Sequence, residues 1–269
     1  MSPELTFLLS LALRMAVSAA FVVIASMITE RSGPAIGALV ATLPVSAGPS
    51  YLFLALDHDA AFIGESALAS LPMNAATILM CLVFVHLAQR RGLGVSLAAG
   101  LAVWFVCAAL VRAVNWTLPG GILFNIVALG VCLPLVQRFR HAKMPLITRR
   151  WYDIPLRAAL VATLVAIVVT LSNIVGPRVS GVIALFPAVF TSLILILTPR
   201  IGGRATAAVL ANGQWGLIGF GIAIVVLHFA AQPLGRATAL SLALATCIAW
   251  NLGLYFYGRR VRPSSKPLT

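Results

Sequence analysis

Long apolar runs, separated by short charged or Gly/Pro-rich segments, fill most of this sequence. Of its 269 residues, 61% are hydrophobic and only 9% are charged. A water-soluble core of this size cannot bury so many apolar side chains, whereas helices of about 20 residues that face lipid can. The sequence therefore predicts an all-α polytopic membrane protein.

The breaks between the apolar runs predict about nine transmembrane helices. Segments such as ERSG, AQRRGLG and TPRIGGR separate them. The predicted spans cover residues 6–29, 34–56, 61–87, 94–113, 118–137, 154–174, 178–198, 205–231 and 235–257. With alternate loops on opposite sides, fourteen Lys and Arg residues fall on one side and three on the other. By the positive-inside rule, the N-terminus is expected outside and the C-terminus in the cytoplasm.

The formal net charge of +13 belongs mainly to these loops. Basic loops beside membrane spans set orientation and contact anionic lipid headgroups. We therefore expect membrane lipids as partners and no nucleic acid.

A short stretch of the sequence occurs twice. GPAIGALVATLP at residues 33–44 is echoed by GPRVSGVIALFP at residues 176–187, and the same shift along the chain aligns Arg14 with Arg157. We name this constant offset of 143 residues the repeat shift. We interpret it as an internal duplication with a linker. The predicted segments are repeat 1 at 1–115, a linker helix and basic cytoplasmic loop at 116–150, repeat 2 at 151–262 and a tail at 263–269. A single linker helix inverts the second repeat, giving a 4+1+4 arrangement that recurs in secondary transporters.

The second proline of each copy predicts the position of a site. Pro44 lies ten residues after Pro34, about 15 Å along a helix and about half the hydrocarbon thickness. Pro187 occupies the matching place in the other copy. Proline removes a helical hydrogen bond, and broken backbone at this depth is tolerated only inside protein or beside a wet cavity. A substrate-lining break and a simple proline kink both stay open.

Hydroxyl and amide side chains near these breaks complete the predicted site. Such groups are costly in lipid and usually face the interior of a helix bundle. The predicted substrate-binding residues are Pro44, Ser46, Ser50, Asn74, Pro187, Thr191, Ser192, Asn212 and Gln214. Hydrogen bonding between helices, without any transport, is the alternative role for the amides.

Charged residues suggest fewer roles. Glu65 is the one carboxylate well inside a predicted span, so it is the candidate for proton coupling, with an interface role as the alternative. We expect Arg14 to extend to a membrane interface. Residues 57–59, Asp-His-Asp, are expected to form a solvated turn, with metal binding as the alternative.

No motif predicts an enzyme. The sequence has no HExxH, no P-loop and no paired carboxylates in one span. We expect no catalytic residues, no cofactor and no resident metal.

Two segments resemble the short signature of small bacterial GlpM-like integral membrane proteins. They are SGVIALFPAVFTSLILIL at 180–197 and IGALVATLPVSAGPSYLFLAL at 36–56. With two such units, the chain resembles a doubled member of that family. The resemblance implies an inner-membrane protein and identifies no substrate.

Together these patterns predict a multi-pass protein of the bacterial inner membrane that acts as a secondary transporter. The expected partner is a small molecule or ion, bound between the broken second and seventh spans, with proton coupling. A homodimer is left open. The alternatives are a non-transporting membrane subunit or accessory factor, and a lipid flippase.

Overall fold

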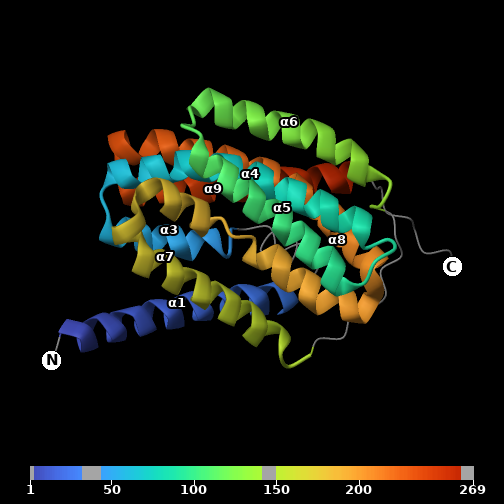
Figure 1. The fold of residues 1–269 in the computed structure, drawn as a ribbon, viewed down its shortest axis with the longest axis horizontal. Helices are drawn as coiled ribbons and strands as arrows, with labels where there is room; N and C mark the ends of the chain where they lie inside the picture. Colours follow the sequence, from blue (N-terminus) through green and yellow to red (C-terminus); the bar gives the residue numbers. More distant parts are fainter. Residues whose placement is uncertain (1–2, 32–43, 141–149, 262–269) are drawn as a thin grey trace.

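The computed structural model describes residues 3–31, 44–140 and 150–261, and every element in these ranges is an α-helix. The helices are drawn in Figure 1, and the all-α prediction is confirmed for this part of the chain. Their bounds are α1 Pro3–Arg31, α3 Ala47–Asp57, α4 Ala60–Leu87, α5 Leu93–Ala113, α6 Leu118–Gln137, α7 Asp153–Ala184, α8 Ala188–Leu234 and α9 Arg236–Val261.

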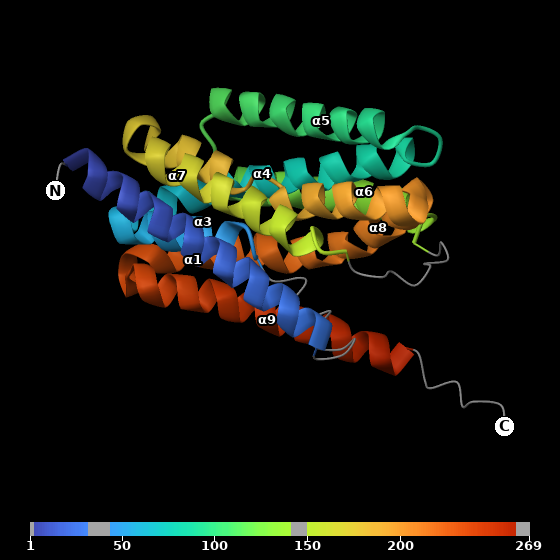
Figure 2. The same ribbon diagram turned by 90° about the horizontal axis from the view of Figure 1, so that it is seen from below.

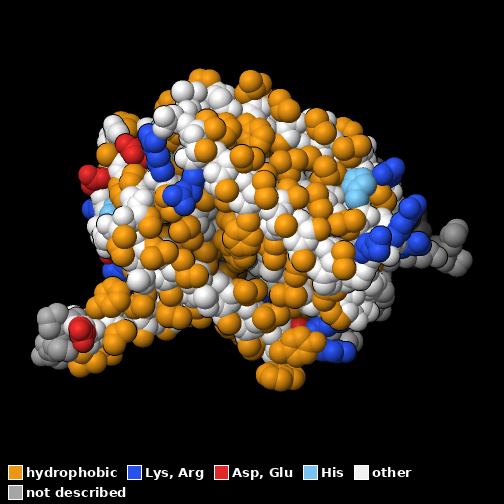
Figure 3. All heavy atoms as spheres, in the orientation of Figure 1, with side chains coloured by type: hydrophobic (Ala, Val, Ile, Leu, Met, Phe, Trp, Pro, Cys, Tyr) orange, Lys and Arg blue, Asp and Glu red, His pale blue; other side chains and the backbone are white. Residues whose placement is uncertain are grey.

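Six helical stretches of the described residues are long and apolar enough to cross a membrane. Hydrophobic side chains cover the middle of the molecule, while Lys and Arg gather towards both ends of its long axis (Figure 3). This distribution matches a hydrocarbon layer crossed along the long axis. The prediction of a multi-pass membrane protein is confirmed.

The six stretches differ from the nine predicted spans for two reasons. The second predicted span covers residues 34–56. Most of the part that precedes α3 falls on residues 32–43, which lie outside the described residues. The sixth, seventh and eighth predicted spans run together in one stretch of 82 residues, Asp153–Leu234. The remaining spans agree with their helices to within a few residues.

The 82-residue stretch changes direction at glycines rather than in loops. Gly176 in α7 has φ 74° and Gly202 in α8 has φ 79°. This left-handed conformation is disfavoured for residues with a Cβ atom, so glycine permits a turn within a single residue. The predicted loops at 174–178 and 198–205 are therefore sharp kinks.

Helix α4 is the centre of the bundle. In its most apolar window 78% of the residues are buried, against 11% for α1 and 17% for α9. It packs along α5, α6, α7 and α8 (Figures 1 and 2). Against α7 the approach is so close that a Cβ atom on Gly181 would lie 2.1 Å from the Ser66 carbonyl oxygen. Ser70 Oγ uses this proximity to donate to the Gly181 carbonyl oxygen at 2.8 Å.

The described chain starts and finishes at opposite ends of the molecule. Helix α1 begins at one end of the long axis and α9 ends at the other (Figures 1 and 2). Helix α3 lies between them and contacts both.

Candidate functional site

The backbone is broken at both of the prolines that the sequence singles out. Pro44 precedes a turn that leads into α3, and residues 185–187 separate α7 from α8 without helical structure. Proline cannot donate the hydrogen bond that would continue a helix, and it pushes the preceding residue out of the helical region. Pro187 leaves the Ile183 carbonyl oxygen without its helical donor, and Phe186 N donates to that oxygen instead at 2.9 Å. The carbonyl oxygens of Pro44 and Pro187 begin the following helices by accepting from Gly48 N at 2.7 Å and from Thr191 N at 2.9 Å.

The two breaks meet at one cavity of about 340 Å³, which we name the central cavity. One wall is the Pro44–Ala47 segment, and another is the break with Leu185, Phe186 and Pro187. Helices α4 and α8 close the remaining sides with Asn74, Thr77 and residues between 209 and 220. Segments that correspond under the repeat shift, although far apart in the sequence, therefore share one space.

Asn74 carries the main polar group of the central cavity. Its side chain is 1% exposed, and its Nδ2 donates to Asn125 Oδ1 at 2.9 Å and to the Leu217 carbonyl oxygen at 3.0 Å. Both neighbours are acceptors, because Asn125 Nδ2 itself donates to the Leu71 carbonyl oxygen at 2.7 Å. The network therefore fixes the orientation of the Asn74 amide. Its Oδ1 has no hydrogen-bond partner, and such a buried acceptor costs about 1–3 kcal/mol.

Asn212 forms another part of the wall and is held by a basic residue. Arg140, which follows α6, donates from Nε to Asn212 Oδ1 at 2.8 Å. The Asn212 Nδ2 group donates to the Ala208 carbonyl oxygen at 2.8 Å. The Arg140 guanidinium also lies 5.6 Å from the centre of the Trp215 ring. Asn212 is thus already engaged within the protein, in contrast to the Asn74 oxygen.

The predicted site residues divide into two groups. Pro44, Ser46, Asn74, Pro187 and Asn212 line the central cavity. The remaining predicted binding residues are buried beside it and do not line it: Ser50, Thr191, Ser192 and Gln214. Their role in binding stays a prediction.

These buried residues mostly serve the helices. Ser50 Oγ donates to the Ser46 carbonyl oxygen at 3.2 Å, and Ser192 Oγ donates to that of Val189 at 2.7 Å. Gln214 Nε2 reaches the Ile78 carbonyl oxygen only at 3.5 Å.

Sequence reasoning missed Thr77, Phe186 and Phe190 in the wall of the central cavity. Thr77 follows Asn74 by three residues, so both side chains lie on one face of α4. Phe186 directly precedes Pro187. Thr77 and Phe186 could have been predicted from their neighbours Asn74 and Pro187, which the sequence had already singled out. Nothing in the sequence indicated Phe190.

Glu65 lies away from the central cavity. It is exposed and lines a groove of about 380 Å³ together with Arg112 and Arg178. Arg178 Nη1 donates to Asn115 Oδ1 at 2.7 Å. Glu65 precedes Asn74 by nine residues on α4, about 14 Å along the helix. The role of Glu65 in proton coupling stays a prediction. Glu65 does not line the central cavity, so this role does not include contact with a solute bound there.

A second cavity of about 280 Å³, which we name the lateral cavity, lies between α1, α3, α8 and α9. It shares Pro44, Ala47 and Phe220 with the central cavity, so the two spaces are separated by a common wall. Among the described residues, no Asp, Glu, Lys or Arg lines either cavity.

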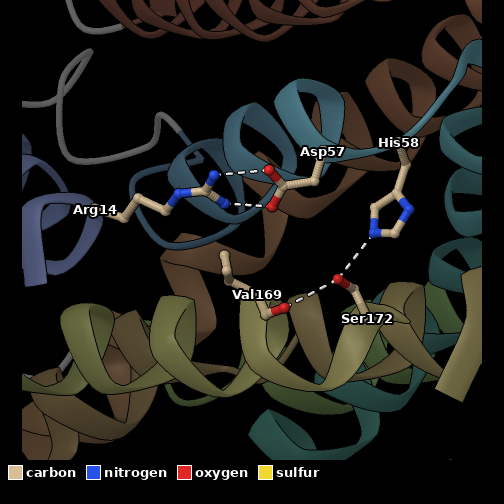
Figure 4. Close-up of polar contacts among 5 residues, drawn as sticks. All are labelled: Arg14, Asp57, His58, Val169 and Ser172. Atoms are coloured by element: carbon tan, nitrogen blue, oxygen red, sulfur yellow. Dashed lines mark hydrogen bonds and ion pairs between the residues drawn. The ribbon is translucent and has the colours of Figure 1, made fainter. Parts of the chain in front are cut away.

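The Asp-His-Asp segment at 57–59 forms a short corner between α3 and α4, and Asp57 and Asp59 are exposed there, as expected for a solvated turn. Asp57 forms an ion pair with Arg14 of α1, and His58 Nε2 lies 2.8 Å from Ser172 Oγ of α7 (Figure 4). Asp59 Oδ1 accepts from Phe62 N at 2.8 Å and so caps α4. Nowhere in the described ranges do three or more His, Cys, Asp or Glu side chains cluster closely enough for a metal.

Arg14 and His58 both take part in this corner. The Arg14 guanidinium binds the Asp57 carboxylate, and the position of Arg14 at a membrane interface stays a prediction. Burial lowers the pKa of His58 below its ordinary value, and this outweighs the opposite effect of Asp57 and Asp59. His58 is therefore neutral at pH 7.

Comparison with protein-family models, with curated proteins and with solved structures finds no match to this chain. The class is consequently defined by the chain's own helices. It is an α-helical multi-pass membrane protein whose two proline breaks line an internal cavity.

Proposed function

We propose that this protein is a secondary transporter of the bacterial inner membrane, with its substrate site in the central cavity. The observation that carries the proposal is that two proline breaks, at Pro44 and Pro187, line one space. Discontinuous helices that meet near the midplane are a recurrent way to build a carrier site. A structural kink would not require both breaks to face the same cavity.

The proposal includes nine membrane crossings in two inverted halves. Supporting it, helices restart at positions that match under the repeat shift. Helix α4 begins at Ala60 and α8 resumes at Gly203, while α5 begins at Leu93 and α9 at Arg236. The opposite placement of the start of α1 and the end of α9 agrees with an odd number of crossings.

In such a carrier the halves move relative to each other around a fixed site. Solute would then reach the central cavity from one side of the membrane at a time. Ser46 and Asn74 would bind it, and the Phe186 ring would pack against it. Proton coupling through Glu65 would have to act along α4, because Glu65 lies outside this cavity.

The first test measures access of water to the central cavity. Ser46→Cys, made in a variant lacking the four native cysteines, is expected to react with a membrane-impermeant maleimide in proteoliposomes. Ser192→Cys is the matched control, since Ser192 is 1% exposed and does not line the cavity. Equal, negligible labelling of both variants from either side would favour a non-transporting subunit.

The second test measures proton coupling. Solutes that raise the thermal stability of the purified protein are taken forward to uptake in proteoliposomes with an imposed pH gradient. Glu65→Gln is expected to abolish pH-driven uptake and to leave binding unchanged. Full pH-driven uptake by this variant would remove Glu65 from the mechanism while leaving the transporter proposal intact.

A further inference from the structure

The lateral cavity opens at the lipid-facing surface. Four of its lining side chains are exposed apolar residues: Val17 at 46%, Phe21 at 45%, Leu52 at 47% and Leu244 at 43%. They come from α1, α3 and α9, the helices that surround its mouth. In a chain that crosses the membrane, this mouth faces hydrocarbon rather than water.

The hydroxyl groups that line the lateral cavity have their donor hydrogens engaged within the protein. Ser18 Oγ donates to the Arg14 carbonyl oxygen at 2.8 Å, and Ser241 Oγ to that of Ala237 at 2.9 Å. Tyr51 OH pairs with Ser70 Oγ at 2.6 Å. Since these hydroxyls are engaged within the protein, the interior suits a hydrocarbon chain.

The central cavity, behind the shared wall, differs in one decisive respect. Asn74 lines this cavity, and its Oδ1 acceptor is buried without a partner, while the Nδ2 group of the same side chain makes two hydrogen bonds. An occupant that donates a hydrogen bond would satisfy it. Because no charged side chain from the described residues lines the space, a charged head would lose its hydration without compensation.

Resting on the transporter proposed above, we propose that the substrate is an amphipathic lipid with an uncharged head that carries a hydroxyl or amide N–H donor. The head binds Asn74 Oδ1 in the central cavity, and the hydrocarbon chain lies in the lateral cavity. The molecule enters from the membrane between α1 and α9, past Pro44 and Phe220 of the shared wall. This selects a lipid carrier from the alternatives that the sequence left open.

Photolabelling in proteoliposomes tests this substrate class. The probe is a monoacylglycerol with a diazirine on its acyl chain, and the expected adducts fall on the lining residues of α1, α3 and α9. Unlabelled 1-monooleoylglycerol is expected to compete. Glycerol, which is the head alone, and oleate, which pairs a similar chain with an anionic head, are expected not to compete.

Matched variants separate the two halves of the site. Ala243→Trp fills the lateral cavity and is expected to reduce labelling at least tenfold. Ala245→Trp, two residues further along α9 and not lining the cavity, is expected to leave labelling unchanged. Asn74→Ala is expected to weaken monooleoylglycerol competition about fivefold. Ser192→Ala is the control, because Ser192 is buried beside the central cavity without lining it and makes no contact with Asn74 in the hydrogen-bond network.

Several outcomes would overturn this substrate class. They are adducts elsewhere on the protein, equal competition by oleate or by glycerol, and equal effects of the Asn74→Ala and Ser192→Ala variants. Transbilayer movement of monooleoylglycerol then separates this inference from the transporter proposal. Specific labelling without movement would keep the binding site and refute transport. A different result would keep transport and refute the lipid substrate. It is uptake of a water-soluble solute, together with maleimide labelling of Ser46→Cys and no specific photolabelling by the monoacylglycerol probe.

Discussion

Two corners of the molecule, Asp57–Asp59 and Arg200–Gly202, are counterparts under the repeat shift and do the same structural task with different residues. Each ends a helical segment that follows a proline, and each is joined by an ion pair to a helix earlier in the chain, α1 or α7. In the first corner, Asp57 binds Arg14 of α1. In the second, Arg200 binds Asp153 at the start of α7. The corners lie towards opposite ends of the long axis (Figure 1).

The difference between the corners concerns the sign of the charges and the backbone. The acid is on the segment after the break in the first corner and on the first helix in the second. The first corner turns in a short connection capped by Asp59, whereas the second turns at the left-handed Gly202. The contact between elements is therefore the same in both corners although the residues that make it are not.

The largest expected effect comes from breaking the second corner. The side chains of Arg200 and Asp153 are 8% and 12% exposed, so Arg200→Ala removes the ion-pair partner of a nearly buried carboxylate and leaves it one hydrogen bond, from Arg150 N. We expect a loss of about 2 kcal/mol in the free energy of unfolding, between the values typical of exposed and of buried pairs. Denaturant titration in detergent micelles measures it. Arg204→Ala is the matched control, and a similar loss there would assign the effect to net charge.

The next effect tests the backbone of the second corner. Gly202→Ala forces an alanine to adopt φ 79°, although nothing lies within 4 Å of the added Cβ atom. We expect a loss of about 1–2 kcal/mol in the free energy of unfolding from backbone strain alone. Gly94→Ala, which also has free space and lies in α5, is expected to cause no loss. Equal values for both variants would show that the kink adapts without strain.

A smaller effect is expected in the first corner. The side chains of Arg14 and Asp57 are 20% and 21% exposed, so solvent screens their ion pair more. Arg14→Ala should lower the free energy of unfolding by about 0.5–1 kcal/mol, in a salt-dependent way. The double exchange Arg14→Asp with Asp57→Arg gives this corner the polarity of the second one. Its stability should return towards that of the unchanged protein, and a further loss would refute the equivalence of the corners.

The smallest effect distinguishes the corners by pH. The folded-state pKa of His58 is lowered by burial, so folding favours its neutral form. This contribution is fully present above the ordinary pKa of 6.5 and is lost as the pH falls through the lower folded-state pKa. His58→Gln should reduce the loss of stability between about pH 7 and pH 5. An unchanged pH dependence would mean that other groups cause it.

The parts of the fold that depend on local chemistry could be predicted from the sequence. Proline lacks the N–H group that continues a helix, so breaks at Pro44 and Pro187 were predicted from the residues, although Pro72 and Pro134 lie inside the helices α4 and α6. The apolar runs likewise located most helices. The one-residue turn at Gly202 could not be distinguished from a loop, because both need the same helix-breaking residues.

The division of the site residues depends on helix rotation, which the sequence does not specify. Asn74 and Gln214 are similar buried amides, yet Asn74 lines the central cavity and Gln214 faces Ile78. Ser192 lies just over one turn beyond the Pro187 break and is buried without lining the cavity. The groove that contains Glu65 could not be predicted from the sequence, because it forms only where α5 and α7 pack beside α4.

The hydrogen bond from Asn74 to Leu217 joins two positions that are direct counterparts under the repeat shift. In the inverted-repeat arrangement proposed above, the axis that relates the two halves would pass through this contact. Here that place has an amide on one side and a leucine on the other, so the local environment is polar in one direction only. A molecule bound there would have one preferred orientation.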